Sequence, residues 1–168
     1  MEKIGLCLWF DGNAEEAAKY YTSIFKGSKL GGITRYGKEG QEIHGGKEGA
    51  VMTVDFEIAG QTFLALNGGP LFKFNEAISL QVFCENQKEV DYYWEKLTAG
   101  GDVKAQQCGW LKDKFGVSWQ IVPAVLPEMM KDKDPRKSER IMKAVLQMKK
   151  FDIAALERAY NGEETARS

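Results

Sequence analysis

The sequence predicts an α+β fold in which two βαβββ modules form curved mixed sheets, followed by a C-terminal helical tail. Two observations lead to this prediction. A strand-and-helix pattern recurs at a fixed offset, and apolar runs of strand length follow each of the two helices. The 168 residues suit one compact domain, with modules at 1–70 and 74–123 and the tail at 124–168.

The first module opens with an apolar run from Ile4 to Phe10, which has the length of a strand. Asn13 and Glu16 then stand three residues apart and predict a capping box at the start of a helix. Gly27 is placed to end this helix in the left-handed conformation. The buried stripe of the helix consists of Ala17, Tyr20, Tyr21, Ile24 and Phe25.

The same pattern returns 73 positions later, as the step from Asn13 to Asn86 shows. The second strand is predicted from Ile78 to Cys84, the capping pair is Asn86 and Glu89, and Gly100 ends the helix. Its apolar stripe consists of Val90, Tyr93, Trp94 and Leu97. Because seven positions match at a single offset, the pattern indicates an internal duplication.

Three further strands are predicted after each helix, so that one helix covers one face of a four-stranded sheet. In the first module they are Leu30 to Tyr36, Val51 to Ile58 and Thr62 to Leu66, with Gly60 and Gln61 as a hairpin turn. In the second they are Val103 to Gln107, Trp110 to Lys112 and Val117 to Val122, with a turn from Asp113 to Gly116.

The tail is predicted to be helical beyond Pro123, which should break the last strand. Asp134 caps a helix that has Pro135 in its first turn. Asp152 starts a second helix, and Gly162 ends it.

The composition excludes several classes of function. Lys and Arg number 23 and Asp and Glu 24, and this balance argues against nucleic acid as a partner. No apolar run is long enough to span a membrane and no signal peptide is evident, so we expect no membrane partner. Three cysteines without a CxxC pair favour the reducing cytoplasm.

Three strings in the chain carry a resemblance to a known family: LWFDGNAEEAAKYYTSIF, ALNGGPLFKFNEAISLQVFC and CGWLKDKFGVSWQIVP. They resemble the PhnB-like branch of the vicinal oxygen chelate superfamily, which includes glyoxalases, dioxygenases and bleomycin and fosfomycin resistance proteins. The branch often carries the label 3-demethylubiquinone-9 3-methyltransferase. The resemblance implies a homodimer whose modules curve around cavities for small molecules.

The methyltransferase label does not fit the residues. S-adenosylmethionine is usually held by a glycine-rich turn that leads from a strand into a helix. The glycine pairs of this chain do not open a helix after a strand; they are Gly31–Gly32, Gly45–Gly46, Gly68–Gly69 and Gly100–Gly101. We therefore expect no such cofactor.

Metal enzymes of the superfamily take His, Glu or Gln ligands from the first and last strands of both modules. The matching positions here are Leu6, Leu64, Ser79 and Gln120, which make a poor cage for a divalent cation. A register slip by one residue, to Cys7, Ala65 or Leu80, gives no better set. The sequence therefore predicts no metal, and it places the single histidine, His44, in an exposed loop.

Strand alternation predicts what lines the cavity instead. In the second module, Ser79, Gln81 and Phe83 share the concave side with Ser118, Gln120 and Val122. Leu6, Leu64 and Leu66 give the first module an apolar wall, and Trp9 and Trp110 lie at the mouth. Because a buried amide needs a partner, Gln81 and Gln120 either pair with each other or with backbone, or they meet a ligand.

Two functions follow from these residues. The first is a small-molecule-binding protein without the standard metal site, which sequesters or carries an apolar or aromatic ligand. Its expected ligand-binding residues are Ser79, Gln81, Gln120, Ser118, Leu6, Leu64, Trp9 and Trp110. The alternative is an enzyme of lyase, isomerase or dioxygenase type on the same fold, in which Gln81 and Gln120 polarise a substrate oxygen; its catalytic residues are unknown.

Overall fold

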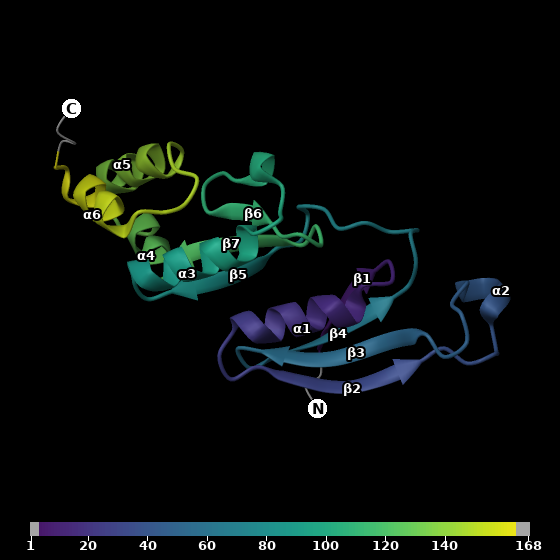
Figure 1. Cartoon of the computed structure of the whole chain (residues 1–168). Coiled ribbons are helices and arrows are strands. Elements are labelled where there is room, and N and C mark those ends of the chain that lie inside the picture. The colour runs from purple at the N-terminus through teal and green to yellow at the C-terminus, as the bar shows by residue number, and fades with distance from the viewer. Residues whose placement is uncertain (1–3, 164–168) are drawn as a thin grey trace. The chain divides into compact units, whose positions relative to one another are not determined.

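The computed structural model describes residues 4–163, and the chain divides into two compact units, one ending at Phe74 and the other beginning at Asn75 (Figure 1). Each unit contains a mixed sheet covered by a helix, as the predicted α+β class requires. No helix within the described residues is long and apolar enough to cross a membrane.

The first unit has a four-stranded sheet in the order β1-β4-β3-β2, with β1 parallel to β4 and the other pairs antiparallel. Its elements are β1 (Leu6–Phe10), α1 (Ala14–Ile24), β2 (Lys29–Arg35), α2 (Gln41–His44), β3 (Val51–Ile58) and β4 (Gln61–Asn67). Helix α1 packs on β3 and β4, where Val54, Phe56 and Phe63 are buried. Ala59 and Gly60 form the β3–β4 turn with positive φ, so the turn lies one residue earlier than expected.

The capping box predicted for α1 is wrong. Asn13 makes no capping hydrogen bond with its side chain. The free N–H of Ala14 instead donates to Oδ1 of Asn67, at 2.9 Å, from the end of β4. Asn67 Nδ2 also donates to the carbonyl of Val51, at 3.0 Å, so one amide joins α1, β3 and β4. The first N–H of α1 is therefore satisfied by a residue 53 positions away, whereas a local cap would bond the second or third N–H of the helix.

The second unit begins with a three-stranded sheet in the order β5-β7-β6. Its elements are β5 (Leu80–Cys84), α3 (Gln87–Thr98), the 3₁₀ turn η1 (Val103–Ala105), β6 (Trp110–Lys112) and β7 (Ser118–Pro123). Here the predicted cap is confirmed, because Asn86 Oδ1 accepts from the N–H of Glu89 at 3.1 Å. Pro123 is the last residue of β7, which shows that the strand reaches the proline that was expected to break it.

The strand expected from Val103 to Gln107 is absent from the second sheet. Residues Val103–Ala105 form η1, and Gln107 makes a single antiparallel bridge to Trp110. Cys108 and Gly109 link them with φ of +51° and +79°, which is the backbone of a two-residue type I′ turn. The second sheet therefore has three strands where the duplication predicted four.

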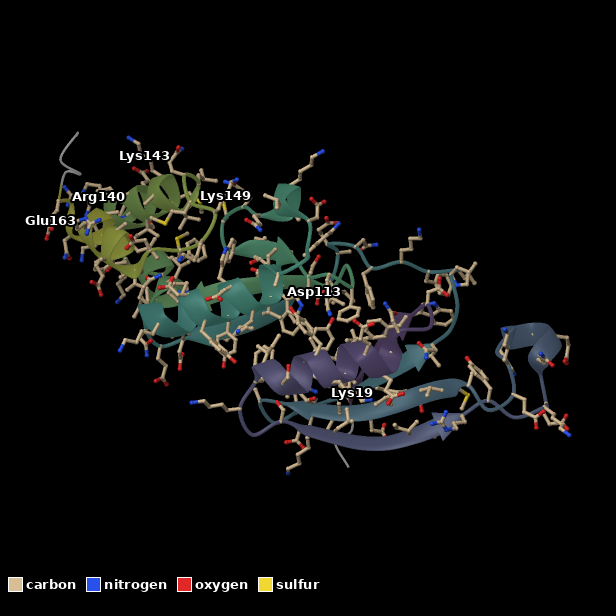
Figure 2. All side chains as sticks on the ribbon, in the orientation of Figure 1. Lys19, Asp113, Arg140, Lys143, Lys149 and Glu163 are labelled. Carbon is tan, nitrogen blue, oxygen red and sulfur yellow. The ribbon has the colours of Figure 1, made fainter. Side chains whose placement is uncertain are left out.

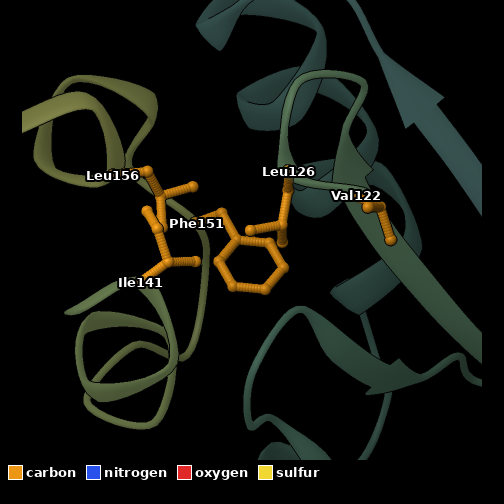
Figure 3. Close-up of a cluster of buried hydrophobic side chains, with 5 residues drawn as sticks. All are labelled: Val122, Leu126, Ile141, Phe151 and Leu156. Carbon is orange, nitrogen blue, oxygen red and sulfur yellow. The ribbon is translucent and has the colours of Figure 1, made fainter. Parts of the chain in front are cut away.

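Three tail helices follow, namely α4 (Leu126–Met130), α5 (Pro135–Val145) and α6 (Ile153–Asn161). The predicted caps are confirmed: Asp134 accepts from Arg136 N, Asp152 accepts from Ala155 N, and Gly162 ends α6 at φ +77°. The helices enclose a cluster of Val122, Leu126, Ile141, Phe151 and Leu156, in which the Phe151 ring lies between the tail helices and the β7 end (Figure 3).

Four hydrogen bonds fasten the segment before α6 to the first residue of α3 and to the turn before β6. The amide of Gln87 donates to the Phe151 carbonyl at 3.1 Å and accepts from Ile153 N at 2.9 Å. The N–H groups of Cys108 and Gly109 donate to the carbonyls of residues 148 and 149, each at 2.8 Å. The tail thus covers the hairpin turn at the place where the fourth strand was expected.

Candidate functional site

Two glutamines and a tryptophan lie side by side on the face of the second sheet that α3 does not cover. The register places Gln81 of β5 beside Gln120 of β7, and Gln120 beside Trp110 of β6. Trp119 and Ile121 alternate with Gln120 and are buried on the side of α3. Gln81 is exposed and Gln120 and Trp110 are half-buried, so this row of side chains is accessible within its own unit.

The two amides are joined in a short hydrogen-bonded chain. Gln120 Nε2 donates to Ser79 Oγ at 2.7 Å, and Gln81 Nε2 donates to Gln120 Oε1 at 3.4 Å. The second of these bonds is long and correspondingly weak. The sequence left open whether the amides pair with each other or meet a ligand. The structure shows the pairing, and it leaves hydrogen-bonding capacity on Gln81 and Ser79.

Ser118 lies two residues before Gln120 on the same side of β7. It is 2% exposed, and its Oγ has no hydrogen-bond partner among the described residues. Lys112 stands opposite Ser118 in β6, and its Nζ pairs with Glu76 at 2.5 Å. The structure therefore brings four predicted residues, Ser79, Gln81, Ser118 and Gln120, onto one face, with Trp110 beside them.

A buried carboxylate holds the hairpin that carries this face. Asp113 is 2% exposed and lies between β6 and β7 (Figure 2). Its Oδ1 accepts from the N–H groups of Phe115 and Val117 at 2.9 and 3.0 Å, and its Oδ2 accepts from Trp119 Nε1 at 2.8 Å. Sequence reasoning assigned Asp113 to a turn and missed this role, which needs the positions of all three donors.

The predicted apolar wall of the first unit is only partly formed. Leu64 pairs with Cys7 and Leu66 pairs with Trp9 across β1 and β4, on the face that α1 leaves open. Leu6 pairs with the buried Phe63 and therefore points toward the opposite side of the sheet from Leu64. The pairing of Leu6 with Leu64 on one wall is thus wrong by one residue, and Cys7 takes the expected place of Leu6.

Trp9 is fixed within the first unit. Its Nε1 donates to the carbonyl of Gly69 at 2.9 Å, and its ring meets Phe72 edge to face at 4.9 Å between centroids. Gly68 lies so close that a Cβ there would come within 2.3 Å of the indole. Trp9 thus packs against the Gly68–Gly69 turn, which gives that glycine pair of the sequence a structural role.

Sequence reasoning also missed a pocket in the first unit, with a volume of about 460 Å³. His44 lies at its wall, on α2, and its ring stacks on Tyr36 at 4.4 Å between centroids. His44 Nδ1 accepts from Gly46 N at 2.9 Å, and Tyr36 Oη donates to the Asn67 carbonyl. The histidine is half-buried on a short helix, so its predicted place in an exposed loop is wrong.

Asp11 and Glu15 also line this pocket. Glu15 pairs with Lys19 at 2.6 Å (Figure 2), and this contact holds the pKa of the Glu15 carboxyl below its usual range. Among residues 4–163, no group of three His, Cys, Asp or Glu side chains is arranged to hold a metal ion.

The mixed sheets with their covering helices have the glyoxalase-like α+β fold. The fosfomycin resistance protein FosX of Listeria monocytogenes, solved with Mn(II) and sulfate, is similar in fold at 16% identity and a TM-score of 0.52, over 78% of this chain and 98% of that chain. Protein PA1353 of Pseudomonas aeruginosa is similar at 19% identity and a TM-score of 0.57, over 73% and 98% of the two chains.

The family model for 3-demethylubiquinone-9 3-methyltransferase matches residues 2–122. A PhnB protein of Bacillus cereus, described by the same activity, is 38% identical over 73% of this chain and 100% of that chain, with a TM-score of 0.64. The chain therefore belongs to this PhnB-like family. A comparison with curated proteins found no match. The tail helices lie beyond the region that the family model matches.

The residues do not fit the S-adenosylmethionine that the family's description implies. The connection from β1 to α1 holds one glycine, Gly12, and the connection from β5 to α3 holds none. Both sheets in the described residues are small and mixed, whereas that cofactor is usually held at a glycine-rich turn of a doubly wound parallel sheet. We derive no methyl-transfer step from this site.

Proposed function

We propose that this protein binds a small apolar or aromatic molecule on the open face of its second sheet, without a metal ion. The observation that supports this proposal is the hydrogen-bonded row of Ser79, Gln120 and Gln81 beside the half-buried ring of Trp110. A few polar groups fixed among aromatic surfaces are typical of small-molecule sites.

The side chains of Ser79 and Gln120 support a site without a bound metal ion. An amide and a hydroxyl are weak ligands for divalent metals, and Leu64, at another of the matching positions, has no donor atom. Ser79 and Gln120 also bond to each other, at 2.7 Å between Oγ and Nε2. This bond orients the Gln120 amide for a ligand atom.

A second candidate is an enzyme on the same fold, and the orientation of the Gln120 amide favours it. Nε2 of Gln120 carries a second hydrogen that is free to polarise a substrate oxygen in addition to its bond to Ser79. Slow conversion of a bound carbonyl compound, followed by NMR of the compound, would support the enzyme; unchanged compound after long incubation would contradict it.

The binding proposal is tested by titrating the ¹⁵N-labelled protein with 2-acetonaphthone, an aromatic ketone. We expect saturable shifts of the side-chain resonances of Gln81, Gln120 and Trp110. Gln120→Leu is expected to weaken the affinity at least fivefold while the protein stays folded, because the variant removes the amide that faces the ligand.

Gln41→Leu is the matched control, since Gln41 is exposed on α2 of the first unit. Its affinity for the ketone should equal that of the wild type. Shifts that spread evenly over the protein, or equal affinities for the Gln120→Leu and Gln41→Leu variants, would contradict the proposed site. Unfolding of Gln120→Leu would show that the amide is structural.

A further inference from the structure

We propose that the groove between the tail helices α5 and α6 (the tail groove) is a second binding site, which takes an organic monoanion with an apolar body, such as a medium-chain carboxylate. The tail groove is separate from the open face of the second sheet, so this inference goes beyond the proposed function. Its residues lie between positions 140 and 163, outside the region that the family model matches. The inference follows from the apolar lining of the groove and from two cationic side chains at its rim.

The tail groove has the size and the lining of a small-molecule site. Its volume is about 450 Å³, and its apolar lining consists of Ala144, Met148, Ala155 and Ala159. Three of these, Ala144, Met148 and Ala159, also pack against the hydrophobic cluster of the tail. Sites for small molecules usually have volumes of about 300–1,000 Å³ and are lined mainly by apolar side chains. The groove therefore suits the apolar body of a ligand.

Arg140 lines the tail groove and is held in place by the end of α6 (Figure 2). Its Nε donates to the Ala159 carbonyl at 2.8 Å, and its Nη2 donates to the Tyr160 carbonyl at 2.7 Å. These bonds use two of the five N–H groups of the guanidinium, and the other three have no bond to a described residue. Because its position is already fixed, the guanidinium loses little freedom when it binds an anion.

Lys143 adds a second positive charge to the rim, three residues after Arg140 and therefore on the same face of α5. It is exposed and makes no ion pair with a described residue. Glu163 contributes the single negative charge among the described lining residues. The Asp134 carboxylate, on which the charge of Arg140 also acts, is already paired with Arg136 at 3.1 Å. Two positive charges and one negative charge match a monoanion.

A carboxylate with an apolar body is the class of ligand that uses both features of the tail groove. Its oxygens accept from the unused N–H groups of Arg140 and from the Lys143 ammonium, in charge-assisted bonds that are stronger than neutral ones. Its body covers the alanines and Met148, whose flexible thioether adapts to the shape of an apolar partner. A dianion would meet the Glu163 carboxylate, and a cation would meet two like charges.

The test compares four probes with a linear apolar chain: octanoate, octyl phosphate, octylammonium and 1-octanol. The ¹⁵N-labelled full chain is titrated with each probe at low salt and at pH 8, where octyl phosphate is mainly a dianion. We expect saturable shifts of the backbone amides of Ala144, Ala159 and Gly162, and a Kd for octanoate about fivefold lower than for the other probes. Equal or tighter binding of another probe, or shifts that lie outside α5 and α6, would overturn the inference.

Lys143→Gln separates the charge of the rim from the apolar lining. The variant should stay folded, because Lys143 has no partner among the described residues, and it should bind octanoate about threefold more weakly while its affinity for 1-octanol is unchanged. Lys88→Gln is the matched control, since Lys88 is an exposed lysine of α3 that also makes no ion pair with a described residue. Equal octanoate affinities of the two variants would contradict the role of Lys143.

Ala155→Leu fills the tail groove and is expected to abolish the binding of octanoate and of 1-octanol. Ala154→Leu is the matched control, because Ala154 is exposed on α6 and does not line the groove. The control and Gln120→Leu should both bind octanoate like the wild type, and loss of octanoate binding in either would contradict a separate site in the tail. If two copies of the chain cover the groove instead, octanoate will not bind and Ala155→Leu will lower the sedimentation mass; this result would overturn the inference.

Discussion

Helices α1 and α3 occupy equivalent places in the two sheet units, and Asn13 and Asn86 precede them at the same position of the duplicated pattern. Asn86 caps its own helix through the N–H of Glu89. Asn13 makes no side-chain cap, and in α1 it is the first N–H, that of Ala14, that donates to a side chain, Asn67 at the end of β4. Equivalent residues therefore act differently, and the first unit satisfies a different N–H of its helix with a side chain that is distant in the sequence.

The hairpins of the two units show a related difference. The β3–β4 turn closes through the backbone of Ala59 and Gly60, both at positive φ. The β6–β7 hairpin depends on the buried carboxylate of Asp113, which accepts three hydrogen bonds. The first unit thus forms its last two strands by local backbone geometry, and the second needs a side chain to hold the strand that carries Gln120.

The tail helices extend this difference. The second sheet lacks the strand expected at 103–107, and the segment around Phe151 packs on the turn at Gly109 instead. A Cβ at Gly109 would lie 2.3 Å from the Phe151 ring, so the two surfaces are in close contact. The missing strand leaves the turn before β6 without a neighbouring strand, and the Phe151 ring of the tail packs against Gly109 in this turn.

The largest effect is expected from Asp113→Ala, which removes the acceptor of three donors, two of them buried. We expect a loss of about 3 kcal/mol in the free energy of unfolding of the second unit, measured by urea denaturation. Asp102→Ala is the control, since Asp102 caps η1 at the surface and should cost about 1 kcal/mol or less. Equal losses in the free energy of unfolding for the two variants would show that the Asp113 hydrogen bonds contribute no more than the surface cap at Asp102.

A smaller effect is expected from Asn67→Ala, at about 2 kcal/mol, because the variant removes both the remote cap of α1 and the bond to Val51. Asn86→Ala should cost about 1 kcal/mol, as is usual for a local cap. Asn13→Ala should change the free energy of unfolding by less than about 0.5 kcal/mol. A larger loss of unfolding free energy in Asn13→Ala than in Asn67→Ala would show that Asn13, and not Asn67, stabilises the start of α1.

The smallest effect is a loss of unfolding free energy at alkaline pH, which we expect from the Cys84 thiol. Burial, with a smaller contribution from the Glu89 carboxylate, raises the pKa of the Cys84 thiol to about 12, above its ordinary value of 9.0. A thiol whose folded-state pKa is raised contributes stability that is present below pH 9 and is lost as the pH rises toward 12. We expect a loss on the order of 1 kcal/mol between pH 8 and pH 9.5.

Cys84→Ala isolates this contribution, because urea denaturation of the variant over the same pH range should give a flatter profile than the wild type. Cys108→Ala is the control, since Cys108 is only half-buried, in the turn between Gln107 and Trp110. Identical profiles for wild type and Cys84→Ala would contradict the assignment.

The sequence predicted features that are local along the chain. Helices α1, α3, α5 and α6, the caps at Asn86, Asp134 and Asp152, and the strand Val51–Ile58 follow from side-chain period and capping chemistry within a few residues. The same alternation placed Ser79, Gln81, Ser118 and Gln120 on one face of the second sheet. This worked because a strand fixes which side each residue faces once one side is seen to be apolar.

Tertiary structure decided what depends on partners far apart in the sequence. The bond from Ala14 to Asn67, the hydrogen bonds that hold the Cys108–Gly109 turn to residues 148 and 149, and the register that pairs Leu64 with Cys7 all join residues tens of positions apart. Local patterns carry no information on such contacts, because their free energies depend on groups that only the folded chain brings together.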